Sequence, residues 1–227
     1  KRDISLFKNN KIKPSVKMLL SRNQFRRYRM SYSDNYYFSY FDNLLTKNKK
    51  TITADITPSY SGLKSKRLRE IQQNFLLRGV NTKAVIFVRE PLSRIKSAVR
   101  SNLDKNNYLE GISLNETDFH KALRQYYKSE HCIIRTRYER IISEAKNVFS
   151  AENLYLGFYE NMFEHHEVRR LSDFLQIDTK TEFANVRVNK TRSSVYDTDS
   201  DAAIREFYKD TYKYFSKNYR ITRNLWS

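Results

Sequence analysis

The sequence predicts an α/β fold in which helices flank a central parallel sheet. Residues 84–88 form an apolar run rich in β-branched side chains, which is typical of a strand buried on both faces of such a sheet, and the strand is expected over residues 83–89. Residues 51–55 predict a second strand, and the apolar spacing over 63–78 predicts a helix between the two. These elements make a βαβ unit with a right-handed crossover, and a strand at 153–159 is expected to join the same sheet.

The rest of the chain predicts further helices around one core. These helices are expected at residues 34–47, 91–102, 117–128, 131–148, 163–175 and 200–217. Residues 178–198 are polar and without periodicity, which predicts a long surface loop of the kind that often serves as a binding lid. With 227 residues, 39% of them hydrophobic, the chain can bury one sizeable core, so we expect a single domain over residues 1–227.

The most informative segment is the turn between the strand at 83–89 and the helix that follows it. Pro91 suits the first turn of that helix, because its φ is fixed and an N–H there would have no helical partner. Arg89 therefore leaves the carboxyl end of a central strand, where open α/β sheets bind ligands. Arg94 and Ser97 follow, so a guanidinium and a hydroxyl can face one anion. The alternative is an ordinary strand, loop and helix with a surface arginine.

This turn resembles the 3′-phosphate-binding element of sulfotransferases that use 3′-phosphoadenosine 5′-phosphosulfate (PAPS). The family pattern is an apolar strand followed by Arg, an acid or Asn, Pro, two residues, Arg, two residues and Ser. The pattern is filled here without a gap by Arg89, Glu90, Pro91, Arg94 and Ser97. The resemblance implies that Arg89 and Ser97 hold the 3′-phosphate of the nucleotide.

Further segments are similar to the same family and occur in its order along the chain. Residues 53–60 look like a Gly-Glu-Ile-Thr-Pro-x-Tyr segment, with an aspartate in place of the glutamate. Residues 153–160 and 171–175 look like a later strand ending in Tyr-Glu and a helix ending in Phe-Leu. Residues 188–193 are similar to the Val-Asn loop that closes over the nucleotide. The resemblance thereby adds three nucleotide-binding residues: Asn189, Lys190 and Arg192.

The resemblance implies a P-loop-like three-layer fold and a specific reaction. A sulfuryl group passes from PAPS to an acceptor hydroxyl or amine, and the family requires no metal. Fixed cationic and N–H donors stabilise the charge that develops on the bridging oxygen, while a carboxylate or histidine takes the acceptor's proton. The acceptor is expected to be a hydroxylated compound such as an anionic glycan, a bacterial carbohydrate or a lipopolysaccharide.

Candidate catalytic and acceptor residues also follow from the resemblance. Asp3 is the nearest match to the acid of a Lys-Glu-x-x-Phe-Phe segment, although an exposed acid at a frayed end is an equal alternative. Asp55 is the second candidate for the base, and its alternative role is to cap the next helix. Thr57 and Tyr60 are expected to shape the acceptor side. Tyr138 resembles a tyrosine near the family's cleft, but packing between helices is the favoured interpretation.

One family motif is missing from these residues. The Lys-x-Gly-Thr-Thr turn that binds the 5′-phosphosulfate cannot be found, because none of the four glycines precedes a helix start rich in lysine and threonine. Residues 1–7 resemble the segment that follows this turn and its helix. We therefore expect a strand, a phosphate loop and a helix of a longer protein to precede Lys1. Without them, a basic binding module would be the better interpretation.

The net charge of +18 indicates an anionic partner. Basic residues cluster at 22–29, 47–50, 64–69 and 135–140, and tyrosines follow the first cluster. The alternative function is therefore that of a nucleic-acid or polyanion-binding protein without catalysis. Ordinary solvated helix faces would give a similar composition. A P-loop kinase is disfavoured, because no Gly-Lys-Ser/Thr segment is present.

The cysteine, histidine and apolar patterns indicate which kinds of protein and site are not expected here. Cys132 is the only cysteine, so the chain contains no internal disulfide, and we expect a cytoplasmic protein. The four histidines lack the spacing of zinc ligands, so no metal site is expected. No apolar run approaches the length of a transmembrane helix.

Overall fold

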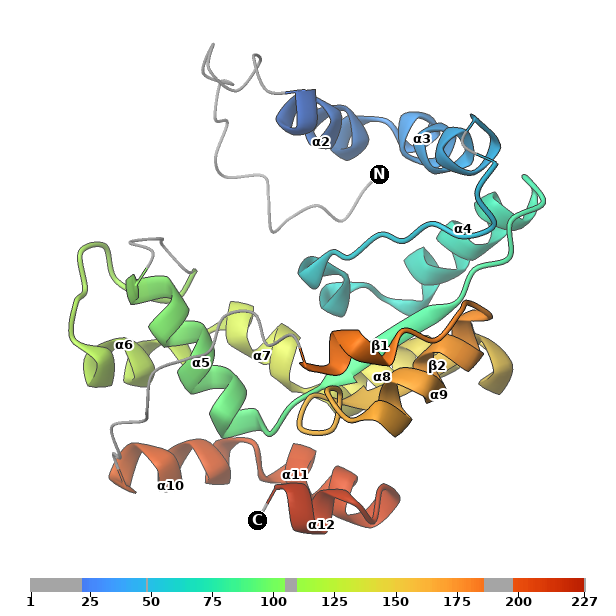
Figure 1. Cartoon of the computed structure of the whole chain (residues 1–227). Helices are drawn as coiled ribbons and strands as arrows, with labels where there is room; N and C mark the ends of the chain where they lie inside the picture. Colours follow the sequence, from blue (N-terminus) through green and yellow to red (C-terminus); the bar gives the residue numbers. More distant parts are fainter. Residues whose placement is uncertain (1–21, 48, 105–109, 186–197, 227) are drawn as a thin grey trace. The chain divides into compact units, whose positions relative to one another are not determined.

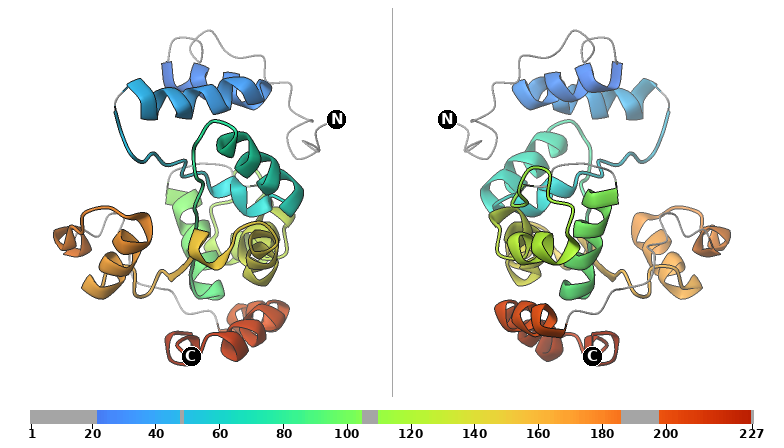
Figure 2. Two further views of the ribbon diagram at one scale, coloured as in Figure 1. Left: turned by 90° about the vertical axis from the view of Figure 1, so that its right-hand side faces the viewer. Right: turned by 90° about the vertical axis from the view of Figure 1, so that its left-hand side faces the viewer.

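The computed structural model describes residues 22–47, 49–104, 110–185 and 198–226, and they belong to two compact units (Figures 1 and 2). Of the described residues, one unit contains 22–47, 49–56 and 74–80, and the other contains 57–73, 81–104, 110–185 and 198–226. The described part is mostly helical and contains a small parallel sheet, which is compatible with the predicted α/β class. Its elements are, in order, α2 (Arg22–Tyr32), α3 (Asp34–Lys47), η2 (Pro58–Gly62), α4 (Ser65–Leu76), β1 (Ala84–Val88), α5 (Pro91–Asp104), α6 (Phe119–Tyr126), α7 (Glu130–Thr136), α8 (Tyr138–Lys146), η3 (Ala151–Asn153), β2 (Leu154–Phe158), α9 (His165–Leu175), η4 (Thr181–Asn185), α10 (Thr198–Phe207), α11 (Lys209–Asn218) and α12 (Thr222–Leu225).

The sheet consists of β1 and β2, which run parallel. Their register pairs Ala84 with Leu154 at one end and Val88 with Phe158 at the other. The amide of Tyr159 extends the ladder by donating to the carbonyl of Val88 at 2.7 Å. The prediction that the strand at 153–159 joins the strand at 83–89 is therefore confirmed.

Two predictions about the strands were wrong. Residues 51–55 form no strand among the described residues, and so the βαβ unit expected around the helix at 63–78 does not form. The physical reason is that this polar segment has one large apolar side chain, Ile52, which remains 41% exposed and gives the segment no buried face. Nor is β1 buried on both faces, because Val85 and Phe87 are 41% and 36% exposed.

Most predicted helices are present, but two of them are broken. The helix expected at 131–148 divides at Arg137, whose ψ of 74° is not helical, into α7 and α8. The helix expected at 200–217 divides at Tyr208, whose hydroxyl donates to the buried carbonyl of Tyr127 at 2.7 Å. Helix α2 was not predicted.

The described residues of the larger unit form two apolar clusters. The first joins α5, α6, α7 and α10, and Ile95, Leu123 and Ile204 are fully buried in it. The second packs α8, α11 and α12 against the carboxyl ends of both strands through Val88, Phe158, Phe215 and Trp226. These clusters fix the end of the sheet and the start of α5, where the predicted anion site lies.

The smaller unit has its own aromatic cluster. Phe38 and Phe41 of α3 are buried and pack against Phe75, with the rings of Phe38 and Phe75 5.1 Å apart in an edge-to-face arrangement. The guanidinium of Arg78 covers the Phe38 ring at 5.2 Å. Helices α2 and α3 are consecutive and in contact (Figure 2).

Candidate anion-binding site at the carboxyl end of the sheet

The start of α5 is fixed by the carboxylate of Glu90. One of its oxygens accepts the amide hydrogen of Ser93 at 2.6 Å, so an otherwise free amide of the first helical turn is satisfied. The other oxygen accepts the hydroxyl of Tyr212, which itself accepts the amide hydrogen of Leu92 at 3.2 Å. Glu90 is buried, and Arg205 approaches it to 3.7 Å. The first turn of α5 is therefore anchored to α10 and α11.

The ends of the two strands are joined by a second carboxylate. Glu160, which follows β2, accepts the amide hydrogen of Glu90 at 2.7 Å. Its other oxygen is buried and has no hydrogen-bond partner in the described part of the chain. Because Tyr159 also bonds to Val88, the residues just beyond β1 and β2 are held side by side.

Arg89 lies in this frame with its charge uncompensated. Its guanidinium stands 4.5 Å from the centre of the Tyr159 ring, a cation–π distance. It makes no ion pair with any carboxylate of the described residues, and its side chain is half-buried. A planar cation held on an aromatic ring, without an acidic partner, is suited to receive a phosphate or sulfate.

Ser97 is compatible with the same role. It lies in the second turn of α5, is half-buried, and its hydroxyl has no hydrogen-bond partner in the described part of the molecule. Ser93 and Ser97 are one turn and a little more apart, so they share a face of α5 distinct from the buried face of Ile95 and Val99. Among the described residues, Arg89 therefore has no acidic partner and the Ser97 hydroxyl has no hydrogen-bond partner.

Arg94, in contrast, is engaged in the core. Its Nη1 donates to the hydroxyl of Thr136 on α7 at 3.0 Å and lies 3.8 Å from the sulfur of Cys132. Burial by itself lowers the pKa of this guanidinium, but Tyr126 and the other neighbouring groups raise it above its ordinary value. In this structure Arg94 joins α5 to α7, and its predicted contact with the nucleotide stays a prediction.

Tyr138 has the packing position that was favoured for it. Its ring is buried, meeting Phe215 at 5.9 Å and Trp226 at 6.4 Å, and burial raises the pKa of its hydroxyl. Tyr138 is therefore part of the second apolar cluster of the larger unit.

Three of the remaining predicted residues belong to other segments of the described chain, and four lie outside it. Asp55 belongs to the smaller unit, where its Oδ2 accepts the hydroxyl of Tyr37 at 3.1 Å. Thr57 and Tyr60 belong to the larger unit, and the amide of Tyr60 donates to the carbonyl of Thr57 at 3.0 Å as η2 begins. The other four lie outside the described residues: Asp3, Asn189, Lys190 and Arg192.

Sequence reasoning missed the groups that hold this site together. Tyr159 and Glu160 stood in the Tyr-Glu pair after β2, but the pair was assigned no contact with Arg89 or Glu90. Tyr212 is separated from Glu90 by 122 positions, and no local pattern connects them.

A second cationic feature lies on α2 and α3 of the smaller unit. The guanidinium of Arg29 stands 4.0 Å from the ring centre of Tyr36, and that of Arg26 stands 5.8 Å from the ring of Tyr40. Neither arginine forms an ion pair among the described residues. Tyr32 is 66% exposed and adjoins Tyr28. We call these residues the arginine–tyrosine face.

Metal and membrane features were also sought. Within residues 22–47, 49–104, 110–185 and 198–226, no three His, Cys, Asp or Glu side chains form a group that could hold a metal ion. In the same residues, no helix is both long enough and apolar enough to cross a membrane. Comparisons of the chain with protein families, with characterised proteins and with solved structures found no match.

Proposed function

We propose that the protein is a sulfotransferase that binds PAPS with Arg89 and Ser97 on the 3′-phosphate. The observation that carries this proposal is the Arg89 guanidinium, which lies beyond β1, stacks on Tyr159 and has no acidic partner among the described residues. Ligands of open α/β sheets bind at this end of the strands. The proposed fold is a P-loop-like three-layer fold with further parallel strands beside β1 and β2.

The chemistry of this end of the sheet supports a terminal phosphate as the ligand. A 3′-phosphate is a dianion or monoanion whose oxygens accept two or more hydrogen bonds, and Arg89 offers several donors in one plane. Ser97 adds a neutral donor. The carboxylates of Glu90 and Glu160 accept backbone amides and hold the turn in place, and neither forms an ion pair with Arg89.

The proposed reaction moves the sulfuryl group of PAPS to an acceptor hydroxyl, with an anionic glycan as the acceptor class. Cleavage of the sulfur–oxygen bond leaves charge on the 5′-phosphate of the departing nucleotide, and fixed cations stabilise that charge. The acceptor's proton passes to a carboxylate, for which Asp3 and Asp55 are the candidates. The Oδ2 of Asp55 accepts a hydroxyl hydrogen from Tyr37.

Thermal unfolding with nucleotides tests the proposal. Adding 3′-phosphoadenosine 5′-phosphate, the desulfonated product, should raise the melting temperature by an amount that increases with its affinity and its concentration. Adenosine 5′-phosphate at equal concentration should raise it less, because it lacks the 3′-phosphate that Arg89 receives. Equal shifts with both nucleotides, or none with either, would contradict the proposal.

The arginine–tyrosine face favours a second candidate function, the binding of a polyanion without catalysis. Arg26 and Arg29 are held on tyrosine rings, and this arrangement suits phosphate or sulfate groups along a polymer. The affinity of such binding falls steeply with salt. Arg29→Gln should weaken binding of an anionic polymer and leave the nucleotide-induced rise in melting temperature unchanged. Arg89→Ala should reduce that rise and leave polymer binding unchanged.

A further inference from the structure

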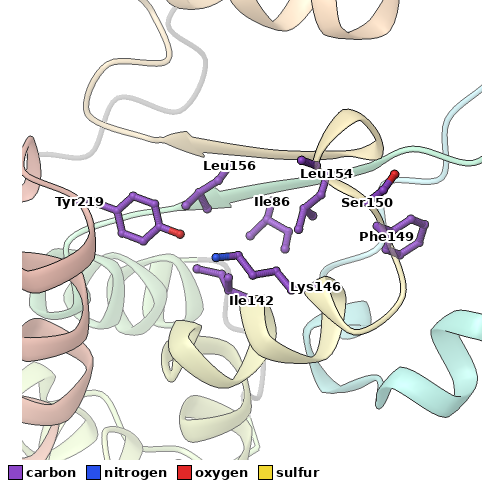
Figure 3. A pocket seen from close by; sticks show the side chains of 9 residues that line it. Ile86, Ile142, Lys146, Phe149, Ser150, Leu154, Leu156 and Tyr219 are labelled. Atoms are coloured by element: carbon purple, nitrogen blue, oxygen red, sulfur yellow. The ribbon is translucent and has the colours of Figure 1, made fainter.

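A pocket of about 510 Å³ lies on one face of the sheet in the larger unit (Figure 3). Its walls come from the middle of β1 at Ile86 and from β2 at Leu154 and Leu156. Helix α8 and residues 149–151, which precede β2, close it along the sides. Because Arg89 and Ser97 follow the carboxyl end of β1, the pocket is a different place from the proposed nucleotide site.

The pocket exists because the neighbouring helices leave part of this face of the sheet uncovered. Side chains alternate along a strand, so Ile86, Leu154 and Leu156 share this face, and all three remain only half-buried. The Tyr219 ring is fixed at one end by Phe215, whose ring centre is 5.2 Å away, and by Phe158 at 5.9 Å. These contacts hold Tyr219 as a wall of the pocket.

Two polar groups meet at one end of a mostly apolar pocket. In Figure 3 the ammonium of Lys146 and the hydroxyl of Tyr219 point toward each other at this end, while Phe149 and Ser150, whose hydroxyl is a third polar group, lie at the other end. Lys146 forms no ion pair with a carboxylate of the described residues. The ring of Tyr214 lies beside that of Tyr219, with the ring centres 6.3 Å apart.

We propose that this pocket binds a small organic acid with an apolar body, its carboxylate meeting Lys146 and Tyr219. The volume lies within the range of about 300–1,000 Å³ typical of small-molecule sites, and so does the pattern of apolar walls with a few convergent polar groups. One ammonium and one phenol satisfy a single carboxylate. A polyphosphate or a polymer would need more cations than this pocket offers. The inference does not rest on the proposed sulfotransferase function.

Octanoate and its neutral analogue octanol are the probes that test this site. In protein labelled with ¹³C at isoleucine and leucine methyls, octanoate should shift the signals of Ile86, Ile142, Leu154 and Leu156. The methyl of Ile204, which is buried in the other cluster of the larger unit, should not move. Lys146→Met should weaken octanoate binding about fivefold and leave octanol binding unchanged, as expected of an exposed ion pair.

Two further variants make the test decisive. Lys213→Met removes an exposed lysine of α11 outside the pocket and should leave octanoate binding unchanged. Tyr219→Phe keeps the ring that packs on Phe215 and removes only the hydroxyl, so it should weaken octanoate binding about threefold. The proposal is overturned if the wild type binds octanoate and octanol equally, if Lys146→Met and Lys213→Met behave alike, or if octanoate shifts Ile204 instead of the pocket methyls.

Discussion

Replacing Gly157 with alanine tests the register of the sheet, which sets Arg89 beside Tyr159. Gly157 lies opposite Phe87, and a Cβ at Gly157 would be 2.4 Å from the Cε1 of that ring. The ring must therefore move. Because Phe87 is 36% exposed, it can turn partly into solvent, and we expect Gly157→Ala to cost about 1–2 kcal/mol of unfolding free energy, the lower part of the range for overpacking.

Removing the ring should reverse the sign of this effect. In a Phe87→Ala background the added methyl meets no ring, and alanine is better than glycine in a strand by about 0.5–1 kcal/mol. Gly157→Ala should then stabilise the protein slightly. The assay is urea unfolding of the wild type, both single variants and the double variant, which gives a coupling energy of about 2 kcal/mol.

Gly79→Ala is the matched control. Gly79 has a φ of +70° and no atom within 4 Å of an added Cβ, so alanine there is strained by the backbone alone. Its cost should be the same with and without the Phe87 ring. An equal cost of Gly157→Ala in both backgrounds would refute the register and the reasoning built on it.

Two other predictions concern the packing of α7. Thr136→Val deprives the buried guanidinium of Arg94 of its acceptor at 3.0 Å and should cost about 1–3 kcal/mol in urea unfolding, whereas Thr46→Val at an exposed hydroxyl should cost little. Burial and the nearby Arg135 and Arg94 lower the pKa of His131 to about 4 from 6.5. As the pH falls, the His131 imidazole is therefore protonated in the unfolded chain before it is protonated in the folded chain. The free energy of unfolding should fall as the pH drops from 6.5 toward 4. His131→Gln should reduce that slope between pH 6.5 and 4.5, and an unchanged slope would contradict the assignment.

Local patterns were sufficient to predict β1, β2 and the helix after β1. The apolar run before Arg89 and the position of Pro91 locate β1 and α5 without knowledge of the rest of the fold. The breaks at Arg137 and Tyr208 escaped prediction. The contact of the Tyr208 hydroxyl with Tyr127 depends on a residue 81 positions away. The segment 51–55 has the composition of a strand but no apolar face to bury.

The candidate site was predictable only in part, for the same reason. Arg89 and Ser97 follow from one continuous motif. The partner of the Arg89 guanidinium is Tyr159, which reaches it because β2 lies parallel to β1, and the turn is held by Tyr212 from α11. These contacts arise from tertiary structure and leave no pattern in neighbouring residues. The pocket lined by Ile86, Lys146 and Tyr219 has the same origin.

Calorimetric titration of nucleotides into the wild type and Arg89→Ala tests the central claim most directly. Loss of the charge-assisted contacts should weaken binding of 3′-phosphoadenosine 5′-phosphate by about 2–4 kcal/mol. Adenosine 5′-phosphate should bind both proteins alike. The control Arg100→Ala removes an arginine of α5 that stacks on Phe119 at 5.3 Å, and it should leave both affinities unchanged. An equal loss for both nucleotides, or no loss for either, would contradict the assignment of Arg89 to the 3′-phosphate.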